Sequence, residues 1–236
     1  MPLVILIEGL IAAGKSTFIY KCLIPFLETK GLRVKVIKEP VDKWVECGIL
    51  QRFYSDTTRW GYTFQAKAFH DRIMEAIRVY EEEPKADVYI AERSPYSDHI
   101  FMDVAHKDGK VDDLEYKMYR EWWELWHRLL PYAPDLVVYL QTTPKVCMER
   151  LHARNRDGES KIPVEYQLKL LQGHEEVFGG ANVELGPYDV PCMHLNGDSN
   201  FEKDEADRDQ LLSEVWEYID HHLYGEDESL TDGEPE

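Results

Sequence analysis

The chain has 236 residues, of which 44% are hydrophobic, and a formal net charge of −18 at pH 7. No stretch approaches the ~20 apolar residues that cross a bilayer, and the negative charge disfavours nucleic acid as a partner. We expect a single domain over residues 1–224, followed by an acidic, disordered tail over residues 225–236. The first apolar run begins at residue 3 and no two cysteines form a C-x-x-C pair, so we expect no targeting segment and a cytoplasmic location.

The first predicted element is a buried strand, Leu3–Glu8, and a phosphate-binding loop follows it directly. Residues 9–17 read Gly-Leu-Ile-Ala-Ala-Gly-Lys-Ser-Thr and match the pattern G-x-x-x-x-G-K-[ST], and residues 16–26 predict a helix that ends near Pro25. The glycines let backbone N–H groups face a phosphate, Lys15 can reach the β- and γ-phosphates, and the Ser16 hydroxyl can bind Mg²⁺. A glycine-bearing turn before an ordinary helix is the alternative, but strand, loop and helix in register favour nucleoside triphosphate binding. The nucleotide-binding residues expected here are Gly9, Ala12, Ala13, Gly14, Lys15, Ser16 and Thr17.

Four further apolar runs predict strands at residues 34–38, 88–91, 136–140 and 192–195, with helical stretches between them. This alternation is typical of an α/β fold, and it predicts a five-stranded parallel sheet with helices on both faces. Ligands of such sheets lie beyond the carboxyl ends of the strands. The residues that follow each run are therefore candidates for the site.

Glu39 follows the second run, with Pro40 after it. A carboxylate at this point could accept the proton of an attacking hydroxyl group. A surface glutamate at a strand end fits the spacing equally well.

Glu92 and Arg93 follow the third run. Glu92 could hold Mg²⁺ or order its water shell, and Arg93 could neutralise charge on a transferred phosphoryl group or orient Glu39. A structural Glu–Arg pair that closes the strand is the alternative. Ser94-Pro95 predicts a helix N-cap followed by proline at the first helical position.

Two helical segments carry aromatic side chains. In residues 63–80, Gln65 and Arg72 lie about two turns apart near aromatic rings and could hydrogen-bond a flat heterocycle, although the pattern by itself favours an ordinary amphipathic helix. The tryptophans of residues 116–130 are interpreted as core or as a subunit interface.

Arg150, Arg154 and Arg156 bracket a loop closed by Asp157-Gly158 and follow the fourth run. They could fold over the phosphates as an arginine-bearing lid. A solvated basic turn is the alternative.

These motifs together resemble the deoxynucleoside kinase family, which includes deoxycytidine, deoxyguanosine and mitochondrial thymidine kinases. The resemblance covers about residues 3–204. It rests on the P-loop, on Glu-Pro-Val-x-Lys-Trp from Glu39, on Thr-Phe-Gln from Thr63, on Glu-Arg-Ser from Glu92, on the lid and on His174-Glu175. It implies a P-loop kinase fold, ATP as phosphoryl donor and magnesium as cofactor.

The resemblance also implies roles for individual residues. Glu39 is similar to the base for the nucleoside 5′-hydroxyl, with Arg93 and Lys15 as the other catalytic residues and Glu92 near the magnesium. Tyr54 and Glu175 would hold the sugar 3′-hydroxyl. The loop that holds the donor base would include Asp198 and Phe201. The nucleoside pocket would be lined by Trp44, Phe64, Gln65, Phe69, Arg72 and Asp98.

The resemblance further implies a base preference and an oligomeric state. Arg72 and Asp98 stand where deoxycytidine and deoxyguanosine kinases carry an Arg/Asp pair, which would fill the space that a thymine methyl needs. We therefore expect deoxycytidine or purine deoxynucleosides to be preferred over thymidine. A homodimer is also expected by resemblance.

Two other functions fit parts of the sequence. A nucleoside monophosphate kinase of the thymidylate kinase type shares the P-loop, but it needs cations for the acceptor phosphate where this chain carries Glu39. A non-catalytic nucleotide-binding regulator is the second, and the Asn-Lys-x-Asp guanine signature typical of GTPases is absent from the sequence.

Overall fold

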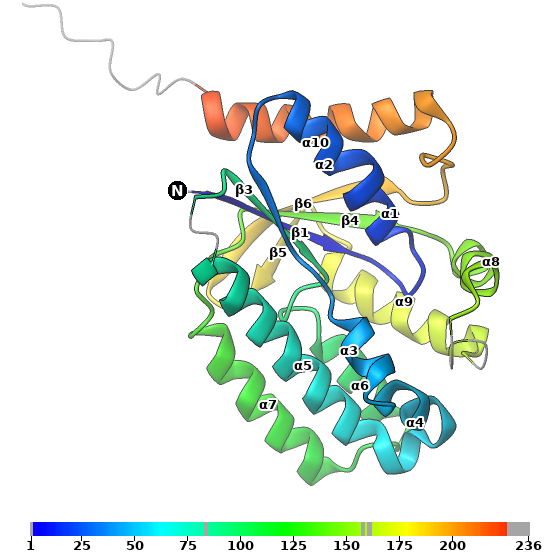
Figure 1. Cartoon of the computed structure of the whole chain (residues 1–236). Helices are drawn as coiled ribbons and strands as arrows, with labels where there is room; N and C mark the ends of the chain where they lie inside the picture. Colours follow the sequence, from blue (N-terminus) through cyan, green and yellow to red (C-terminus); the bar gives the residue numbers. More distant parts are fainter. Residues whose placement is uncertain (1, 83–84, 157–158, 160–161, 226–236) are drawn as a thin grey trace, which may run out of the picture.

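The computed structural model describes residues 2–82, 85–156, 159 and 162–225. A six-stranded sheet with the order β2-β3-β1-β4-β6-β5 occupies the centre of the molecule (Figure 1). Five strands run parallel, and β5 pairs antiparallel to β6. The strands are β1 (Leu3–Glu8), β2 (Val34–Ile37), β3 (Val88–Glu92), β4 (Leu136–Gln141), β5 (Asn182–Leu185) and β6 (Tyr188–Asn196).

The central strands can be predicted from their amino-acid composition, but the edge strand β5 cannot. Every residue of β1 and β3 is buried, which is why both are apolar up to the glutamate that ends each of them. The prediction of five strands is wrong because β5 alternates exposed and buried residues over only four positions. The same alternation hides the first half of β6, so the predicted strand at 192–195 is only its second half.

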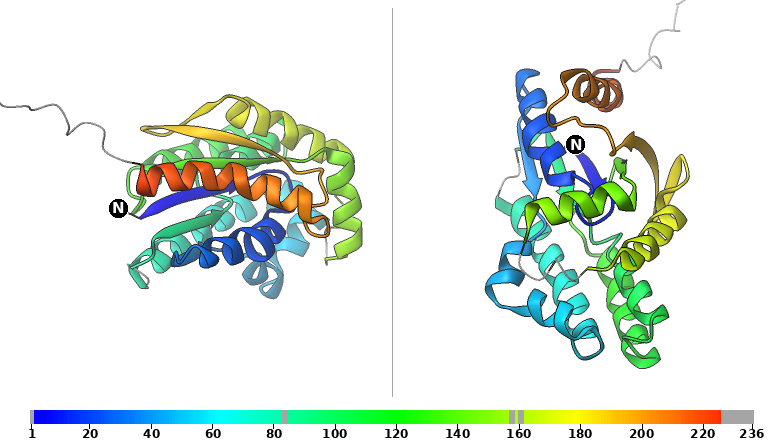
Figure 2. Two further views of the ribbon diagram at one scale, coloured as in Figure 1. Left: turned by 90° about the horizontal axis from the view of Figure 1, so that it is seen from above. Right: turned by 90° about the vertical axis from the view of Figure 1, so that its right-hand side faces the viewer.

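Helices cover both faces of the sheet, as predicted. Figure 1 shows α2 and α10 on one face and α5, α7 and α9 on the other, and the views of Figure 2 show the same layers. The helical elements are α1 (Lys15–Thr17), the π-helical η1 (Phe18–Leu23), α2 (Ile24–Thr29), α3 (Val41–Glu46), α4 (Ile49–Ser55), α5 (Thr57–Glu82), α6 (His99–Lys107), α7 (Asp113–His127), α8 (Pro144–Arg154), α9 (Val164–Phe178) and α10 (Glu205–Tyr224).

The helix after the P-loop does not end near Pro25, as the sequence predicts, but continues to Thr29. Proline cannot donate an N–H, and its ring clashes with the carbonyl four residues earlier in a regular α-helix. Here a π-helical turn precedes it, in which Ile24 N–H donates to Ile19 O, five residues back. This wider turn places Pro25 at the first turn of α2, where proline is tolerated.

The predicted helix start at Pro95 is also wrong, because α6 begins at His99 and residues 95–98 form a turn. Buried Glu8 holds this turn: its carboxylate accepts from Ser94 N–H and from Ser97 Oγ, both at 2.8 Å. The turn carries the chain from the end of β3 to Asp98, which is fully buried.

None of the helices in the described part of the chain is long and apolar enough to cross a bilayer. Of the predicted acidic tail, residues 226–236 lie outside the described residues, as do Asp157 and Gly158 of the predicted lid loop.

Candidate active site

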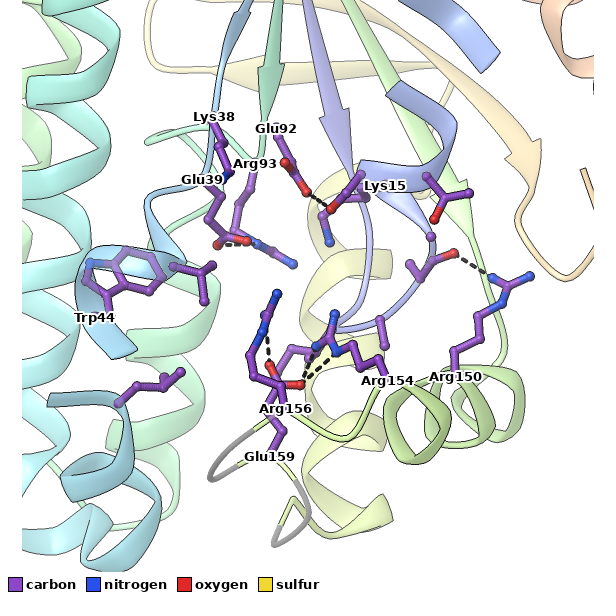
Figure 3. Close-up of a pocket in the computed structure, with 18 of the residues that line it drawn as sticks. Lys15, Lys38, Glu39, Trp44, Glu92, Arg93, Arg150, Arg154, Arg156 and Glu159 are labelled. Carbon is purple, nitrogen blue, oxygen red and sulfur yellow. Dashed lines mark hydrogen bonds and ion pairs between the residues drawn. The ribbon is translucent and has the colours of Figure 1, made fainter. Parts of the chain in front are cut away.

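A cavity of about 730 Å³ opens at the carboxyl ends of β1, β2 and β3, where the fold predicts a ligand. One side is the P-loop with the ends of β2 and β3, and the other is made by α3, α4 and α5. Residues of α8 and its following loop lie across the opening (Figure 3). The cavity is therefore large enough for a nucleoside beside the phosphates of a second ligand.

The P-loop backbone requires its glycines. Gly9 has φ 145° and Gly14 has φ 107°, both in the region that favours glycine. A Cβ on Gly9 would stand 2.8 Å from Leu140 O, and one on Gly14 would stand 3.0 Å from Phe201 Cζ. The loop therefore packs so closely against β4 and the ring of Phe201 that neither Gly9 nor Gly14 has space for a side chain.

Lys15 is folded back onto this loop. Its Nζ donates to Gly9 O at 3.1 Å and to Leu10 O at 2.8 Å. Burial, with Arg93 nearby, lowers the pKa of Lys15 to about 8. A polyphosphate would offer this ammonium group stronger acceptors than the two carbonyls.

Glu39 lies between two arginines at the end of β2. Its Oε1 accepts from Arg72 Nη2 at 2.6 Å. The same oxygen pairs with Arg93 Nε at 3.2 Å (Figure 3). Burial alone would raise the pKa of Glu39, but Arg72, Arg93 and Lys15 outweigh burial and lower it to about 2. The group is therefore a fixed carboxylate at any physiological pH.

Arg93 is aimed into the cavity by its backbone and by two further partners. Its φ of 58° is unusual for a residue with a side chain. Nη2 donates to Gly9 O at 2.7 Å, and Nη1 lies 3.3 Å from His174 Nε2. Burial and Arg93 hold the pKa of His174 well below its usual range, so the neutral ring donates from Nδ1 to Leu170 O and accepts from Arg93.

Ser16 and Glu92 face each other next to Lys15. The Ser16 hydroxyl donates to Glu92 Oε1. Burial, and then the charge of Glu39, raises the pKa of Glu92. A hydroxyl and a carboxylate are the hard oxygen donors that magnesium prefers, and Mg²⁺ needs only one or two such protein ligands beside water and phosphate.

Aromatic rings form the wall opposite the P-loop. Trp44 and Phe64 meet edge to face with centroids 5.5 Å apart, and Phe53 stacks on Phe64 at 4.6 Å. Two nitrogens beside these rings, Gln65 Nε2 and Arg72 Nε, are buried and have no hydrogen-bond partner in the described part of the chain. Both residues line the cavity, so both nitrogens can donate to a flat ligand between the rings.

The predicted lid arginines divide into two groups. Arg150 Nη1 donates to Ala13 O at 2.7 Å and to Gly197 O at 2.8 Å, which ties the P-loop to the loop after β6. Arg154 and Arg156 instead pair with Glu159, at 2.7 and 3.1 Å. Figure 3 shows these three residues across the cavity from Glu39.

Comparison with known proteins decides which family combines these features: residues 5–220 match the deoxynucleoside kinase family. The chain belongs to that family. A probable deoxycytidine kinase of Fowlpox virus (strain NVSL) is 34% identical over 90% of this chain and 86% of the relative. Deoxycytidine kinase 2 of Gallus gallus is 31% identical over 90% and 89% of the two chains. The mitochondrial thymidine kinase 2 of Homo sapiens is 32% identical over 89% of this chain and 78% of the relative.

Most residues that the sequence proposes for the site of this kinase line the cavity. Gly9 and Asp98 do not line it but bond to residues that do: Gly9 to Lys15 and Arg93, and Asp98 to Arg72. The sequence-proposed residues that line it are Ala12, Ala13, Gly14, Lys15, Ser16, Thr17, Glu39, Trp44, Tyr54, Phe64, Gln65, Arg72, Glu92, Arg93, Arg150, Arg154, Arg156 and Phe201.

Three further proposed residues lie outside the cavity lining and, in the part of the chain that the structure describes, have no hydrogen bond to the site residues named above. Phe69 packs on Tyr119 in a separate apolar cluster, with centroids 5.5 Å apart. Asp198 accepts from Thr143 N–H at 2.8 Å in the loop after β6. Glu175 accepts from Tyr139 Oη at 2.9 Å, so the structure does not bring its carboxylate to Tyr54.

The sequence analysis assigns no role to four residues that contribute to the site. Phe53 and Tyr166 line the cavity, and His174 contacts Arg93. Glu159 also lines it, is only 3% exposed, and is among the charges that act on the Tyr54 hydroxyl. Its sequence signal is an acid three residues after Arg156, in a segment otherwise proposed to be basic.

Proposed function

We propose that this chain transfers the γ-phosphoryl group of ATP to the 5′-hydroxyl of a deoxynucleoside. The observation that carries the proposal is the Glu39 carboxylate, held between Arg72 and Arg93 in the same cavity as the P-loop. A carboxylate at this point suits a neutral alcohol and would repel the phosphate of a nucleoside monophosphate. The geometry therefore favours a nucleoside kinase over a thymidylate-kinase-type enzyme.

The transfer needs a base and positive charge close together. As the 5′-oxygen attacks the γ-phosphorus, Glu39 accepts the hydroxyl proton, and the bond to the β-phosphate oxygen breaks to release ADP. Lys15 and Arg93 stabilise the negative charge on the moving group. Ser16 and Glu92 would hold Mg²⁺, which supplies further charge neutralisation when bound.

The other half of the cavity fits the deoxynucleoside. Trp44 and Phe64 would enclose the base, and Gln65 would hydrogen-bond its edge. For the sugar 3′-hydroxyl we propose Tyr54 together with Glu159 in place of Glu175, because Glu159 lines the cavity and Glu175 does not.

We further propose that deoxycytidine or purine deoxynucleosides are preferred over thymidine. Arg72 and Asp98 form a buried ion pair behind the base position, with side chains 6% and 0% exposed. This pair fills space that a thymine methyl needs, and Arg72 Nε offers a donor to a ring nitrogen or carbonyl.

The decisive experiment compares the initial rates of ATP-dependent phosphorylation of the four deoxynucleosides and thymidylate by the wild type and Glu39→Gln. We expect fast turnover of a deoxynucleoside, none of thymidylate, and a loss in kcat of roughly 10²–10⁴-fold in the variant. Turnover of thymidylate alone, or full activity of Glu39→Gln, would contradict the proposal. Hydrolysis of ATP with no acceptor phosphorylated would instead support a nucleotide-binding regulator.

We also propose that the chain forms a homodimer. The outward face of α7 carries large apolar side chains at helical spacing, with exposed fractions of 43–68%. These residues of α7 are Leu114, Met118, Trp122 and Leu125. Together with Leu129, which lies in the turn directly after the helix and is 55% exposed, we call them the α7 stripe. Such a contiguous apolar face is typical of a protein–protein interface.

A cytoplasmic location is a further proposal. All four cysteines are free thiols, and three of them are buried. Free thiols are expected in a compartment that keeps cysteines reduced.

A further inference from the structure

We propose that Tyr119 is a positioning residue for base recognition: its hydroxyl holds Asp98, so that Asp98 keeps Arg72 turned toward the nucleobase. The proposal deepens the proposed function and rests on it, because it concerns how the same cavity chooses among nucleosides.

The first step is a buried chain of three side chains, which come from α7, from the turn before α6 and from α5. Tyr119 of α7 donates from Oη to Asp98 Oδ2 at 2.5 Å. Asp98, the residue before α6, accepts from Arg72 Nη1 of α5 through its other oxygen, Oδ1. The exposed fractions of Tyr119 and Asp98 are 2% and 0%, so no solvent competes for these bonds.

The second step is how the three nitrogens of the Arg72 guanidinium are shared among their partners. Nη1 donates to Asp98, Nη2 donates to Glu39 at 2.6 Å, and Nε has no partner among the described residues. A guanidinium is a rigid plane, so fixing its two terminal nitrogens also fixes the direction of its Nε–H. The orientation of the free donor in the base pocket thus depends on Asp98.

The third step is the reason that Asp98 needs the phenol. Without the Tyr119 hydroxyl, Oδ2 would be a buried charged acceptor with no partner, which is unfavourable. Arg72 could satisfy both oxygens by turning to a two-pronged pairing with Asp98, which would draw Nη2 from Glu39 and redirect Nε. Tyr119 prevents this turn by occupying Oδ2.

Two features keep Tyr119 fixed in this role. Burial raises the pKa of its hydroxyl well above the usual range, so the phenol remains a neutral donor. Its ring packs against Phe69, a residue outside the cavity lining, with centroids 5.5 Å apart. The phenol is therefore held in place by residues behind the pocket, and it would not itself touch the ligand.

The test is Tyr119→Phe, and α7 offers a matched control. Tyr116, one turn earlier on α7, donates its hydroxyl to Asp103 Oδ1 of α6 at 2.8 Å, and neither residue lines the cavity. We expect Tyr119→Phe to lower, by about tenfold, the ratio of kcat/KM for the best deoxynucleoside to that for the worst, mostly through KM. Tyr116→Phe should keep this ratio within about twofold of the wild type.

A double-mutant cycle with Arg72→Lys asks whether Tyr119 acts through Arg72. If it does, Tyr119→Phe changes the ratio much less in the Arg72→Lys background than in the wild type. Equal effects in both backgrounds, an unchanged ratio in Tyr119→Phe, or the same loss in Tyr116→Phe would each overturn the proposal.

A crystal structure of Tyr119→Phe separates this proposal from the proposed function. Movement of Arg72 away from Glu39 supports the positioning role, and an unmoved Arg72 refutes it. This readout holds even if the wild type phosphorylates no deoxynucleoside, a result that would count against the proposed function alone.

Discussion

Lys15 donates hydrogen bonds to carbonyl groups of its own loop. Because nucleotide binding needs its positive charge, we expect binding to weaken at the pH where Lys15 loses its proton. Burial, followed by the charge of Arg93, lowers its pKa to about 8, so the free protein loses the ammonium group above that pH. Bound phosphates would favour the charged form again. We therefore predict that kcat/KM for ATP falls above about pH 8, whereas kcat at saturating ATP falls at a higher pH.

The measurement is a pair of pH profiles between pH 5 and 9.5. On the acid side, the pKa of Glu39 of about 2 means that this carboxylate stays ionised throughout, so its protonation should produce no acid limb. A kcat/KM for ATP that stays constant to pH 9.5 would contradict the role given to the Lys15 charge.

The indole of Trp44 is held in place by the carboxylate of Asp71, and this contact predicts an effect on nucleoside binding. Trp44 Nε1 donates to Asp71 Oδ2 at 2.9 Å, and Lys67 Nζ lies 2.5 and 2.6 Å from the two oxygens of Asp71. Asp71→Ala removes the partner of a buried indole N–H, so we predict a rise in KM for the deoxynucleoside on the order of tenfold.

Lys67→Ala is the matched control for this prediction. The Lys67 side chain is 46% exposed, and an ion pair so open to solvent contributes little. Its removal leaves the Trp44–Asp71 hydrogen bond in place and should change KM less than about twofold. A larger effect from Lys67→Ala than from Asp71→Ala would show that charge, and not the position of the indole, controls this wall.

At the scale of elements, the packing of α9 on α6 depends on one glycine. A Cβ on Gly173 would stand 2.7 Å from Ile100 Cγ2, closer than any real contact. We predict that Gly173→Ala destabilises the protein by roughly 1–3 kcal/mol, measured by urea unfolding. It should also lower kcat, because the next residue, His174, supports Arg93.

Ile100→Ala tests the cause of this destabilisation. It removes the Cγ2 atom that the new methyl would meet, so the double variant should be more stable than the sum of the two single effects predicts. Additive effects would mean that Gly173 matters for a reason other than its contact with Ile100.

The same scale shows what the sequence could and could not predict. Strands β1, β3 and β4 can be predicted because they are buried on both faces and therefore apolar up to the polar residue that ends each of them. Strand β5 cannot be predicted in this way because its four residues alternate between exposed and buried at the edge of the sheet. Pro25 predicts a helix end, and this prediction is wrong because a π-helical turn depends on hydrogen bonds that no local residue preference reveals.

In the site, too, local sequence patterns can be recognised, whereas contacts between distant segments cannot be predicted. The P-loop and Glu-Arg-Ser are local patterns, and most of the residues proposed from them line the cavity, namely residues 12–17 with Glu92 and Arg93. Glu159 and Glu175 are both acids after the lid arginines, and spacing along the chain cannot tell which of them lies at the cavity. In the structure Glu159 lines the cavity, whereas Glu175 of α9 accepts a hydrogen bond from the Tyr139 hydroxyl.

At the scale of the whole molecule, α7 has two faces with different partners. Its inward face carries Tyr119, which reaches Asp98 behind the base pocket. Its outward face carries the α7 stripe, and Met74 of the neighbouring α5 is also 46% exposed. A second copy of the chain on the outward face would bury these side chains and fix the helix that supports the pocket.

This arrangement predicts that Trp122→Glu with Leu125→Glu converts a dimer into a monomer, because two buried carboxylates without partners would oppose association. The measurement is the molar mass by light scattering after size-exclusion chromatography at micromolar concentration. Leu168→Glu is the matched control: Leu168 is 52% exposed, close to the 54% of Trp122, but lies on α9 outside the α7 stripe. We expect a dimer for the wild type and Leu168→Glu, and a folded monomer for the double variant. A monomeric wild type, or a dimer that survives both charges, would show that the α7 stripe is not the interface.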